Sequence, residues 1–509
     1  MTGGADVKAI PVLLTAAVVQ TAVAGCVAPR TQDAPSASAH QNAWFAAGQQ
    51  TLADRRAIQP IDGPARNVIL FIGDGMDPTT VAAARIFDGQ SRGEPGEENL
   101  LSFERFPHVA YAKTYTTDRQ VSDSAGTMSA MMTGVKTKSG VLSVSNAVVR
   151  KDCASALAAE LPTLGELAKQ AGLAVGVVTT SDVTDATPGA VYAHAADRSW
   201  KHDGALADGA AEAGCRDIAR QLIEFPYGGG LDLVFGGGRA YFLPDTIADL
   251  EQTDKAGVRG DGRNLIDEWR AKSPNHRFVW NTQGFEALAP GTSALGLFER
   301  GKMRFETDRS EDVAGEPSLT AMTTKAIELL SGDPGGYFLV VEGARIDHAH
   351  HGGNAYRALS ETQEFARAVA AARAMTDTRD TLIIVTADHG HSLAFQGYPP
   401  KGNAILGLAS GAAYGDKKPY TTLVYVNGRG SPFYGDTTEG RPVPDNVLDK
   451  DYQQQALIPT WNATHGGQDT GIYASGPNAH LFGGVVEQNY VFHVIDDALG
   501  LRERAEVTN

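Results

Sequence analysis

Cysteine and basic side chains are scarce in this chain of 509 residues. Three cysteines are too few for a scaffold held together by disulfides. Lysine and arginine number 44 against 60 aspartates and glutamates, which gives a formal net charge of −16 at pH 7. That balance argues against a nucleic-acid-binding protein, which needs a basic face for the phosphate backbone. The hydrophobic content of 42% is enough for a large core, in one large α/β domain or two smaller ones.

Residues 10–25 form an apolar segment that is too short, and wrongly flanked, for a stable membrane span. The segment is typical of an export signal, and two cleavage patterns stay open. Residues 22–24 match a simple secretory site, whereas residues 23–26 match a bacterial lipobox, which we favour and in which Cys26 becomes the acylated first residue. Either pattern predicts an exported protein, either secreted or in the periplasm or at the outer membrane or cell surface, where a disulfide can persist. Residues 26–65 are rich in Ala, Ser, Gln and Pro and predict a tether.

Three short apolar runs lead directly into acidic and imidazole side chains. Residues 68–72 are followed by Asp74, the run around residue 340 by Glu342, Asp347 and His351, and residues 383–385 by Asp388 and His389. Sites in open α/β sheets lie outside the carboxyl ends of the strands, so we expect these side chains to converge. Asp347 and His351 are four residues apart, and one helical turn would make them two ligands of one metal.

Strands expected at residues 175–179 and 231–235 alternate with helices expected at residues 121–134, 163–170, 320–330 and 356–375. This order predicts a doubly wound, mostly parallel central sheet with helices on both faces. Residues 185–188 are expected to form a loop, and the polar residues 244–318 an irregular insertion on the rim of the sheet. The stretch 392–462, rich in Gly, Pro and Tyr with one strand at 421–426, predicts a loop-rich, crown-like subdomain over the mouth of the site.

Ser124 lies near the start of the helix expected at residues 121–134. A hydroxyl there experiences the helix dipole and free backbone N–H groups, which favour developing negative charge. In the alternative interpretation, Ser124 is only the N-cap of the helix.

Polar side chains suited to catalysis and metal binding recur through the chain. The candidates are Asp74, Asp123, Ser124, Asp185, Thr187, Arg198, Glu342, Asp347, His348, His351, Asp388, His389 and His465. Apart from Asp123, the list contains five carboxylates, which in one cleft would carry about −5, a charge too costly without compensating cations. Divalent ions together with Arg198 would turn the cleft into a site for a dianionic substrate. Mixed imidazole and carboxylate sets suit zinc, whereas an all-oxygen set such as Asp74, Thr187 and Glu342 suits magnesium.

The motifs GDGM, DSAGT, DATPGAVYAHAADR, VEGARIDHAHH, TADHGH and THGGQD together resemble the alkaline phosphatase family from about residue 67 to residue 499. The resemblance implies a catalytic domain over residues 66–503, a homodimer, and hydrolysis of small-molecule phosphate monoesters. It implies one zinc ion on Asp347, His351 and His465, and a second on Asp74, Asp388 and His389. It further implies magnesium on Asp74, Thr187 and Glu342, with Asp185 orienting its waters. Ser124 would be the nucleophile that becomes phosphoserine, and Arg198 would bind the phosphate.

Other functions stay open beside this one. A phosphodiesterase or sulfatase of the same superfamily would share the paired-metal motifs, and an exported phosphate-binding or metal-binding protein would need no nucleophile. The serine motif, Arg198 and the magnesium residues favour a phosphomonoesterase.

Some features resemble the animal branch of the family. Cys153 and Cys215 occur where animal members carry a disulfide, and the resemblance also implies a calcium site. Residues that match parts of that site are Glu251, Phe298, Glu299 and Glu316. His348 stands where enteric bacterial members carry lysine and animal members histidine, so we expect phosphate to leave more easily. Asp185, by contrast, matches the bacterial residue.

Overall fold

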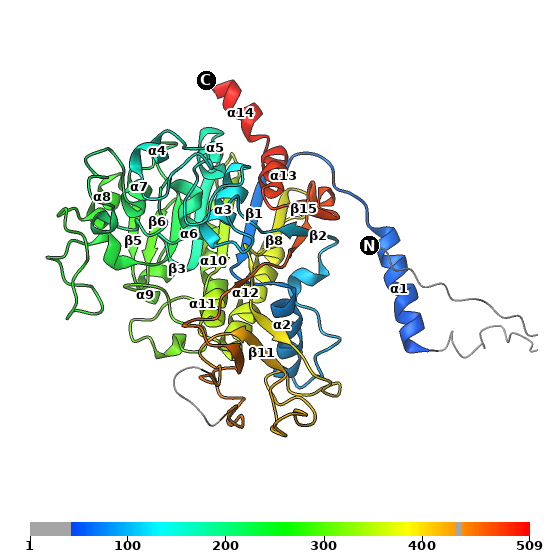
Figure 1. Ribbon diagram of the computed structural model, residues 1–509. Helices are drawn as coiled ribbons and strands as arrows, with labels where there is room; N and C mark the ends of the chain where they lie inside the picture. The colour runs from blue at the N-terminus through cyan, green and yellow to red at the C-terminus, as the bar shows by residue number, and fades with distance from the viewer. Residues whose placement is uncertain (1–41, 434–439, 509) are drawn as a thin grey trace, which may run out of the picture. The chain divides into compact units, whose positions relative to one another are not determined.

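The computed structural model describes residues 42–433 and 440–508 (Figure 1). The contacts divide the chain into two units, residues 1–58 and 59–509. In the first unit, α1 (Ala43–Ala57) is capped by Asn42 and has no buried residue. The composition of this stretch predicts a tether and gives no sign of the helix, because the apolar residues of α1 do not gather on one face. The expected export signal and Cys26 lie outside the described residues.

A ten-stranded sheet runs through the second unit in the order β15-β2-β14-β8-β1-β7-β3-β4-β6-β5 (Figure 1). Neighbouring strands from β8 to β5 pair in parallel, and β14 is antiparallel to both β8 and β2. This confirms the predicted mostly parallel sheet. The strands are β1 (Asn67–Gly73), β2 (His108–Lys113), β3 (Ala174–Asp182), β4 (Leu233–Gly237), β5 (His276–Val279), β6 (Ser293–Leu297), β7 (Tyr337–Gly343), β8 (Thr381–Thr386), β14 (Thr470–Ser475) and β15 (Val485–Glu487).

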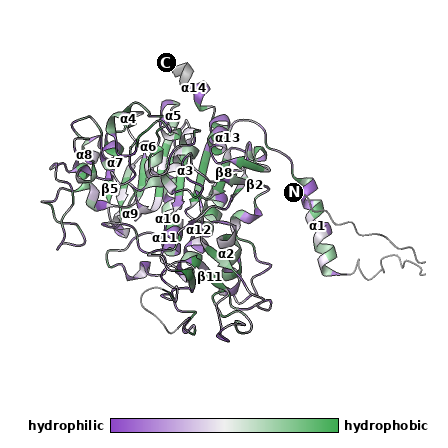
Figure 2. Cartoon of the chain, in the orientation of Figure 1, coloured by the Kyte–Doolittle hydropathy of each residue, from purple (hydrophilic) through white to green (hydrophobic). Residues whose placement is uncertain are grey.

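Alternating side chains of the central strands enter two separate cores. In β1, Val68 and Leu70 join one core, while Ile69 and Phe71 join the other. The first core includes residues of α3 (Ser124–Thr133), α5 (Leu164–Gln170), α6 (Ala186–Tyr192) and α13 (Tyr490–Leu499). The second includes residues of α2 (Pro78–Ser91), α10 (Leu319–Leu330) and α12 (Ala355–Met375). The hydrophobic central strands in Figure 2 are therefore covered by helices on both faces, as predicted.

The helix starts follow from local capping chemistry. Asp77 caps α2 with Pro78 at its start, and Thr163 and Glu166 form a capping box on α5. The expected loop at residues 185–188 is wrong, because Asp185 caps α6. Pro188 lies in the first turn of α6, where its missing N–H costs no intrahelical hydrogen bond.

The expectation of irregular structure at residues 244–318 is also wrong. This stretch contains α8 (Leu265–Ala271) and α9 (Thr282–Glu286), and its strands β5 and β6 extend the edge of the central sheet. Each of the two strands has at most five residues, and long polar connections hide their periodicity.

Residues 392–462 contain a small separate sheet made of β10 (Leu393–Phe395), β11 (Leu423–Asn427) and β12 (Ala456–Ile458). Strand β11 confirms the strand expected at residues 421–426, whereas the other two are too short for a sequence signal. Strand β9 (Gly390–His391) pairs with β13 (His465–Gly466) and brings His465 beside His391. The remaining helices are α4 (Cys153–Leu157), α7 (Ile218–Ile223), α11 (Arg345–His351) and α14 (Leu501–Thr508).

Cys153 and Cys215 form a disulfide with Cα atoms 5.8 Å apart, which confirms the pairing implied by the resemblance. Within residues 42–433 and 440–508, no helix is long and apolar enough to cross a membrane.

Candidate active site

Asp74 lies in the tight turn that follows β1, with glycine on either side. Gly75 has φ +70°, and a Cβ there would lie 3.3 Å from Cα of Asp347 and 3.2 Å from the ring of His391. A glycine is therefore required for the Asp74 turn to pack against α11.

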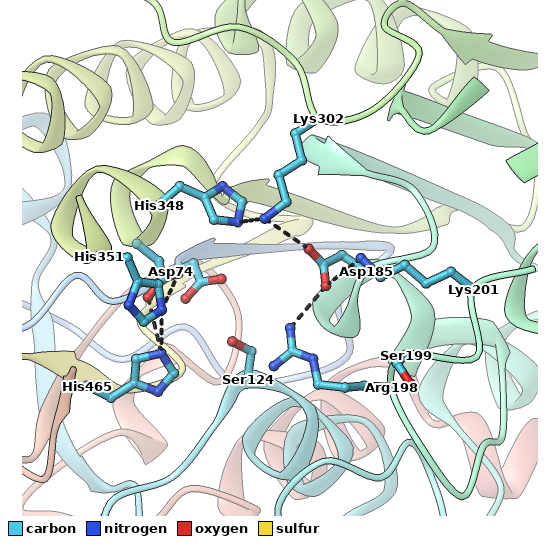
Figure 3. A pocket seen from close by; sticks show the side chains of 11 residues that line it. Asp74, Ser124, Asp185, Arg198, Ser199, Lys201, Lys302, His348, His351 and His465 are labelled. Atoms are coloured by element: carbon cyan, nitrogen blue, oxygen red, sulfur yellow. Dashed lines mark hydrogen bonds and ion pairs between the residues drawn. The ribbon is translucent and has the colours of Figure 1, made fainter. Parts of the chain in front are cut away.

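Asp347, His351, His391 and His465 form one cluster, whose ligand atoms all lie within 4.8 Å of one another. Nε2 of His351 is 3.1 Å from Nε2 of His465 (Figure 3). The Nδ1 atoms of these two rings donate to the carbonyl oxygens of Ala463 and Ser122, at 2.7 and 2.8 Å. Both Nε2 atoms of the neutral rings then carry lone pairs, so a proton or a metal ion has to lie between them.

The electrostatics of this cluster centre on Asp347. Its Oδ1 is 3.2 Å from Nε2 of His391 and 3.4 Å from Nε2 of His465. Burial disfavours the charge on His465, but Asp347 raises the pKa of His465 to about 8. At neutral pH a proton can therefore take the place of a cation in this cluster.

Asp74, Asp388 and His389 form a second cluster within the same distance limit of 4.8 Å. Nε2 of His389 is 3.5 Å from Asp74 Oδ1 and 3.2 Å from Asp388 Oδ2. Among the described residues, neither of these two buried oxygens accepts a hydrogen bond. Burial raises the pKa of Asp388 to about 6 and, with the charges of Asp388 and Asp347, raises the pKa of Asp74 well above its ordinary value. A buried site of this kind needs a cation, so the residues present fit a metal ion.

Glu342, at the end of β7, and Thr187, in α6, supply oxygens at the same edge of the sheet. Glu342 accepts a hydrogen bond from Thr179, and burial raises the pKa of Glu342 to about 8. The buried Thr187 hydroxyl has no hydrogen-bond partner in the described part of the chain. Asp185 Oδ2 accepts a hydrogen bond from Ser181 Oγ at 2.7 Å. Such an oxygen set is typical of magnesium rather than zinc.

Ser124 is the first residue of α3 and is not its cap. Asp123 caps the helix by accepting a hydrogen bond from Gly126 N at 3.2 Å. The interpretation of Ser124 as N-cap is therefore wrong, and its hydroxyl is free for another role. Ser124 Oγ lies 3.2 Å from Nε2 of His389 in the second cluster.

Arg198 crosses the same cavity and is held by two carboxylates. Its guanidinium donates to Asp123 Oδ2 at 3.2 Å and to Asp185 Oδ1 at 3.0 Å. Burial alone would lower the pKa of Arg198, but Asp185 and Asp123 raise it, so the guanidinium stays charged. The cavity has a volume of about 350 Å³ and is lined by Asp74, Ser124, Asp185, Arg198, Ser199, Lys201, Lys302, Asp347, His348, His351 and His465 (Figure 3).

Eight of the thirteen predicted residues line this cavity: Asp74, Ser124, Asp185, Arg198, Asp347, His348, His351 and His465. Asp123 contacts Arg198, His389 contacts Ser124, and Asp388 contacts His389. Glu342, near the end of β7, and Thr187, in α6, lie outside the lining. Sequence reasoning missed His391, although it quoted the TADHGH motif that contains it. It also missed Lys201 and Lys302. Lys201 is three residues from Arg198, which is a weak signal, and Lys302 lies in the stretch interpreted as irregular.

A third carboxylate cluster lies away from this cavity lining. Glu251, Glu299 and Asp312 lie within the 4.8 Å limit, and Glu316 Oε1 accepts a hydrogen bond from Arg304 N at 2.9 Å. Burial raises the pKa of Glu251 to about 7 and that of Glu316 to about 8. Asp312 is not among the residues suggested for calcium by the resemblance, and the Phe298 carbonyl accepts a hydrogen bond from Arg239 at 3.1 Å.

A sequence model described as alkaline phosphatase matches residues 65–501. The tissue-nonspecific isozyme of alkaline phosphatase from Felis catus is 44% identical over 461 residues, covering 89% of this chain and 87% of that protein. An alkaline phosphatase from Gadus morhua is 43% identical over 461 residues and covers 89% of this chain and 95% of its own. This chain belongs to the alkaline phosphatase family.

Solved alkaline phosphatases share the fold. The enzyme from Thermus thermophilus aligns with a TM-score of 0.63 at 23% identity, over 88% of this chain and 96% of its own. That from the Antarctic bacterium TAB5 aligns with a TM-score of 0.58 at 23% identity, over 86% of this chain and 98% of its own. Alkaline phosphatases are metal-dependent phosphomonoesterases, and this chain is a phosphomonoester hydrolase with groups that can hold metal ions. Membership of this family favours a phosphomonoesterase over the three alternatives that the sequence left open, which were a phosphodiesterase, a sulfatase and a non-catalytic binding protein.

Proposed function

We propose that this alkaline phosphatase family member hydrolyses phosphate monoesters through a covalent phosphoserine on Ser124. The main support is the position of the Ser124 hydroxyl, which is spared from capping α3 and shares a cavity with Arg198. In the first step Ser124 Oγ bonds to phosphorus, and the bond from phosphorus to the alcohol oxygen breaks. In the second step water attacks the same phosphorus, and the Ser124 oxygen leaves as inorganic phosphate forms.

The start of α3 favours the negative charge that develops on Ser124 Oγ. The first backbone N–H groups of a helix have no intrahelical partner, and at this end the Asp123 side chain accepts a hydrogen bond from that of Gly126. The helix dipole is also positive here. Arg198 is held by Asp123 and Asp185, so its planar fork is oriented before substrate arrives. A guanidinium can bind two phosphoryl oxygens at once, which a lysine ammonium does less well.

The metal set is proposed from the donor chemistry of each cluster. Asp347, His351 and His465 would hold one zinc ion, and Asp74, Asp388 and His389 a second. Asp74, Thr187 and Glu342 would hold magnesium, with Asp185 orienting its waters. When bound, these ions neutralise the carboxylates and stabilise negative charge on the oxygens of the reacting phosphoryl group. The cluster of Glu251, Glu299 and Asp312, with Glu316 close by, is the candidate for calcium.

Hydrolysis of p-nitrophenyl phosphate before and after dialysis against EDTA tests the proposal. We expect EDTA to abolish activity and lower the melting temperature, because metal removal leaves buried carboxylates without cations. Zinc plus magnesium should restore both properties. Full activity after verified removal of all metal would contradict the metal assignment. Bis-p-nitrophenyl phosphate and p-nitrophenyl sulfate serve as controls, and preference for either would contradict the monoesterase assignment.

We further propose that residues 1–25 are a signal peptide for export. In this proposal a lipid on Cys26 anchors the mature protein to a membrane. Cys26→Ala should move the expressed protein from the detergent phase to the soluble fraction. An unmodified mature N-terminus at Gly25 would instead identify simple secretory cleavage. The proposed homodimer can be checked by light scattering of the purified protein.

A further inference from the structure

Lys302 reaches the active-site cavity from the turn that follows β6. Its ammonium contacts Nε2 of His348 and lies 4.0 Å from Asp185 Oδ2 (Figure 3). The side chain is 39% exposed, so solvent and small ligands can reach it. It occupies the part of the wall next to His348, the histidine that stands where enteric bacterial members carry lysine.

The backbone on both sides of Lys302 is held firmly. The carbonyl oxygen of Gly301 accepts a hydrogen bond from Gly238 N at 2.6 Å, and Met303 N donates to the Thr180 carbonyl oxygen at 3.2 Å. A Cβ on Gly237 would lie only 2.0 Å from the Gly301 oxygen, so the turn packs tightly against the end of β4. The Met303 side chain is buried. Lys302 therefore extends from a fixed point, which lowers the entropy cost of using it to bind a ligand.

Lys201, the second lysine at Asp185, differs from Lys302 in its contacts. Lys201 Nζ lies 3.0 and 2.9 Å from the two carboxylate oxygens of Asp182 and 3.1 Å from Asp185 Oδ1. Its three donors are therefore occupied by protein acceptors. Asp185 Oδ1 pairs with Lys201 and Arg198, and its Oδ2 accepts from Ser181 at 2.7 Å. Lys302 is too distant from Asp185 for a hydrogen bond, so donors of its ammonium remain for a ligand.

We propose that Lys302 binds the phosphoryl group of the substrate and of the phosphate product. Arg198 lies on the Oδ1 side of Asp185 and Lys302 on the Oδ2 side, and Figure 3 shows them approaching this carboxylate from opposite directions. Both cations line the same cavity as Ser124, so a phosphoryl group on Ser124 shares that cavity with both. This inference rests on the proposed function and names a further residue of that site. It also revises the expectation of easier phosphate release, which rested on His348 replacing the lysine of enteric bacterial members. Lys302, from a different turn of the chain, places an ammonium beside His348 instead.

The test compares wild type, Lys302→Met and Lys302→Arg as metal-loaded enzymes. The inhibition constant for inorganic phosphate is measured against p-nitrophenyl phosphate, and the dissociation constant of phosphate is measured by titration calorimetry. We expect Lys302→Met to raise both constants roughly tenfold, as for loss of one partly exposed charge-assisted hydrogen bond. Lys302→Arg keeps the charge and should stay within about threefold of wild type. Lys255→Met is the control, because it removes the same charge from an exposed position whose Nζ contacts Gln252 at 3.0 Å.

Metal content and melting temperature are measured on every variant, so that loss of metal is distinguished from loss of phosphate binding. Phosphate constants within twofold of wild type for a metal-loaded Lys302→Met would overturn the assignment and leave Lys302 as a screening charge for Asp185. An equal rise in Lys255→Met would overturn it as well. If wild type itself did not hydrolyse p-nitrophenyl phosphate, the proposed function would fail. Active wild type with unchanged constants in Lys302→Met would refute only the role of Lys302.

Discussion

Replacing Ser124 with alanine separates catalysis from helix stability. The Ser124 hydroxyl lies 3.2 Å from Nε2 of His389 in the second cluster. Asp123 continues to cap α3 in the variant, and alanine is well tolerated at the first position of a helix. The loss in the free energy of unfolding should therefore be that of one hydrogen bond, about 1 kcal/mol.

The expected loss in catalysis is much larger. In the proposed mechanism no phosphoserine forms without the Ser124 hydroxyl, and turnover should fall by about three orders of magnitude or more. Each factor of ten corresponds to about 1.36 kcal/mol, so the transition state loses about 4 kcal/mol of stabilisation. Because Arg198 and the metal-binding side chains remain, phosphate binding should change little.

Ser129→Ala is the matched control, since Ser129 is a buried serine of the same helix. Its Oγ accepts a hydrogen bond from Ser143 N at 2.8 Å, so the substitution leaves a buried donor unpaired. That change should cost about 1–3 kcal/mol of stability without slowing turnover. The measurements are steady-state hydrolysis of p-nitrophenyl phosphate, urea unfolding, and mass spectrometry of the acid-quenched peptide containing residue 124. A Ser124→Ala variant with more than about a tenth of wild-type turnover would refute the reasoning.

Arg198→Ala should lower kcat/KM roughly tenfold to hundredfold, since charge-assisted bonds to phosphate are lost while the metals remain; an unchanged value would remove Arg198 from the site. Cys153 and Cys215 are 62 residues apart in sequence, so replacing both with serine should lower the free energy of unfolding by roughly 4 kcal/mol in urea titrations. Two free thiols in the denatured, unreduced protein would contradict that expectation. Burial raises the pKa of Glu361 to about 8, so the folded state holds a proton there that the unfolded state releases above about pH 4.5. Wild type should therefore lose stability as pH rises from about 4.5 to about 8, and Glu361→Gln should be less sensitive in thermal unfolding over that range. Parallel pH profiles for the two proteins would show that this carboxyl does not matter.

Elements with strong local signals were predictable from the sequence. Apolar runs identified β1, β7 and β8, and the Asp-Pro pair at residues 77 and 78 identified the start of α2. Those signals are local, because the apolar run of a strand and the capping residues of a helix lie within a few neighbouring positions of the chain. Short strands such as β5 and β6 carry too few residues for a period to be read. Their place in the sheet depends on pairing with strands distant in the sequence.

The sequence by itself determined the residue types of the site and their order along the chain. Acids and imidazoles directly after buried strands were expected to meet at one edge of a parallel sheet, whereas their division into two groups came from the resemblance to the alkaline phosphatase family. Only the tertiary structure decided which of these groups lie in contact. It showed that Asp123 caps α3, because Asp123 has the extended backbone of a cap residue whereas Ser124 is already helical. The Ser124 hydroxyl is therefore not used as the cap. The tertiary structure brought His465 beside His391 through the pairing of β9 with β13, and Lys302 to His348 from a turn that no periodicity marks. Side-chain contacts between distant segments depend on how the strands and turns pack in three dimensions, and a local pattern carries no information about that packing.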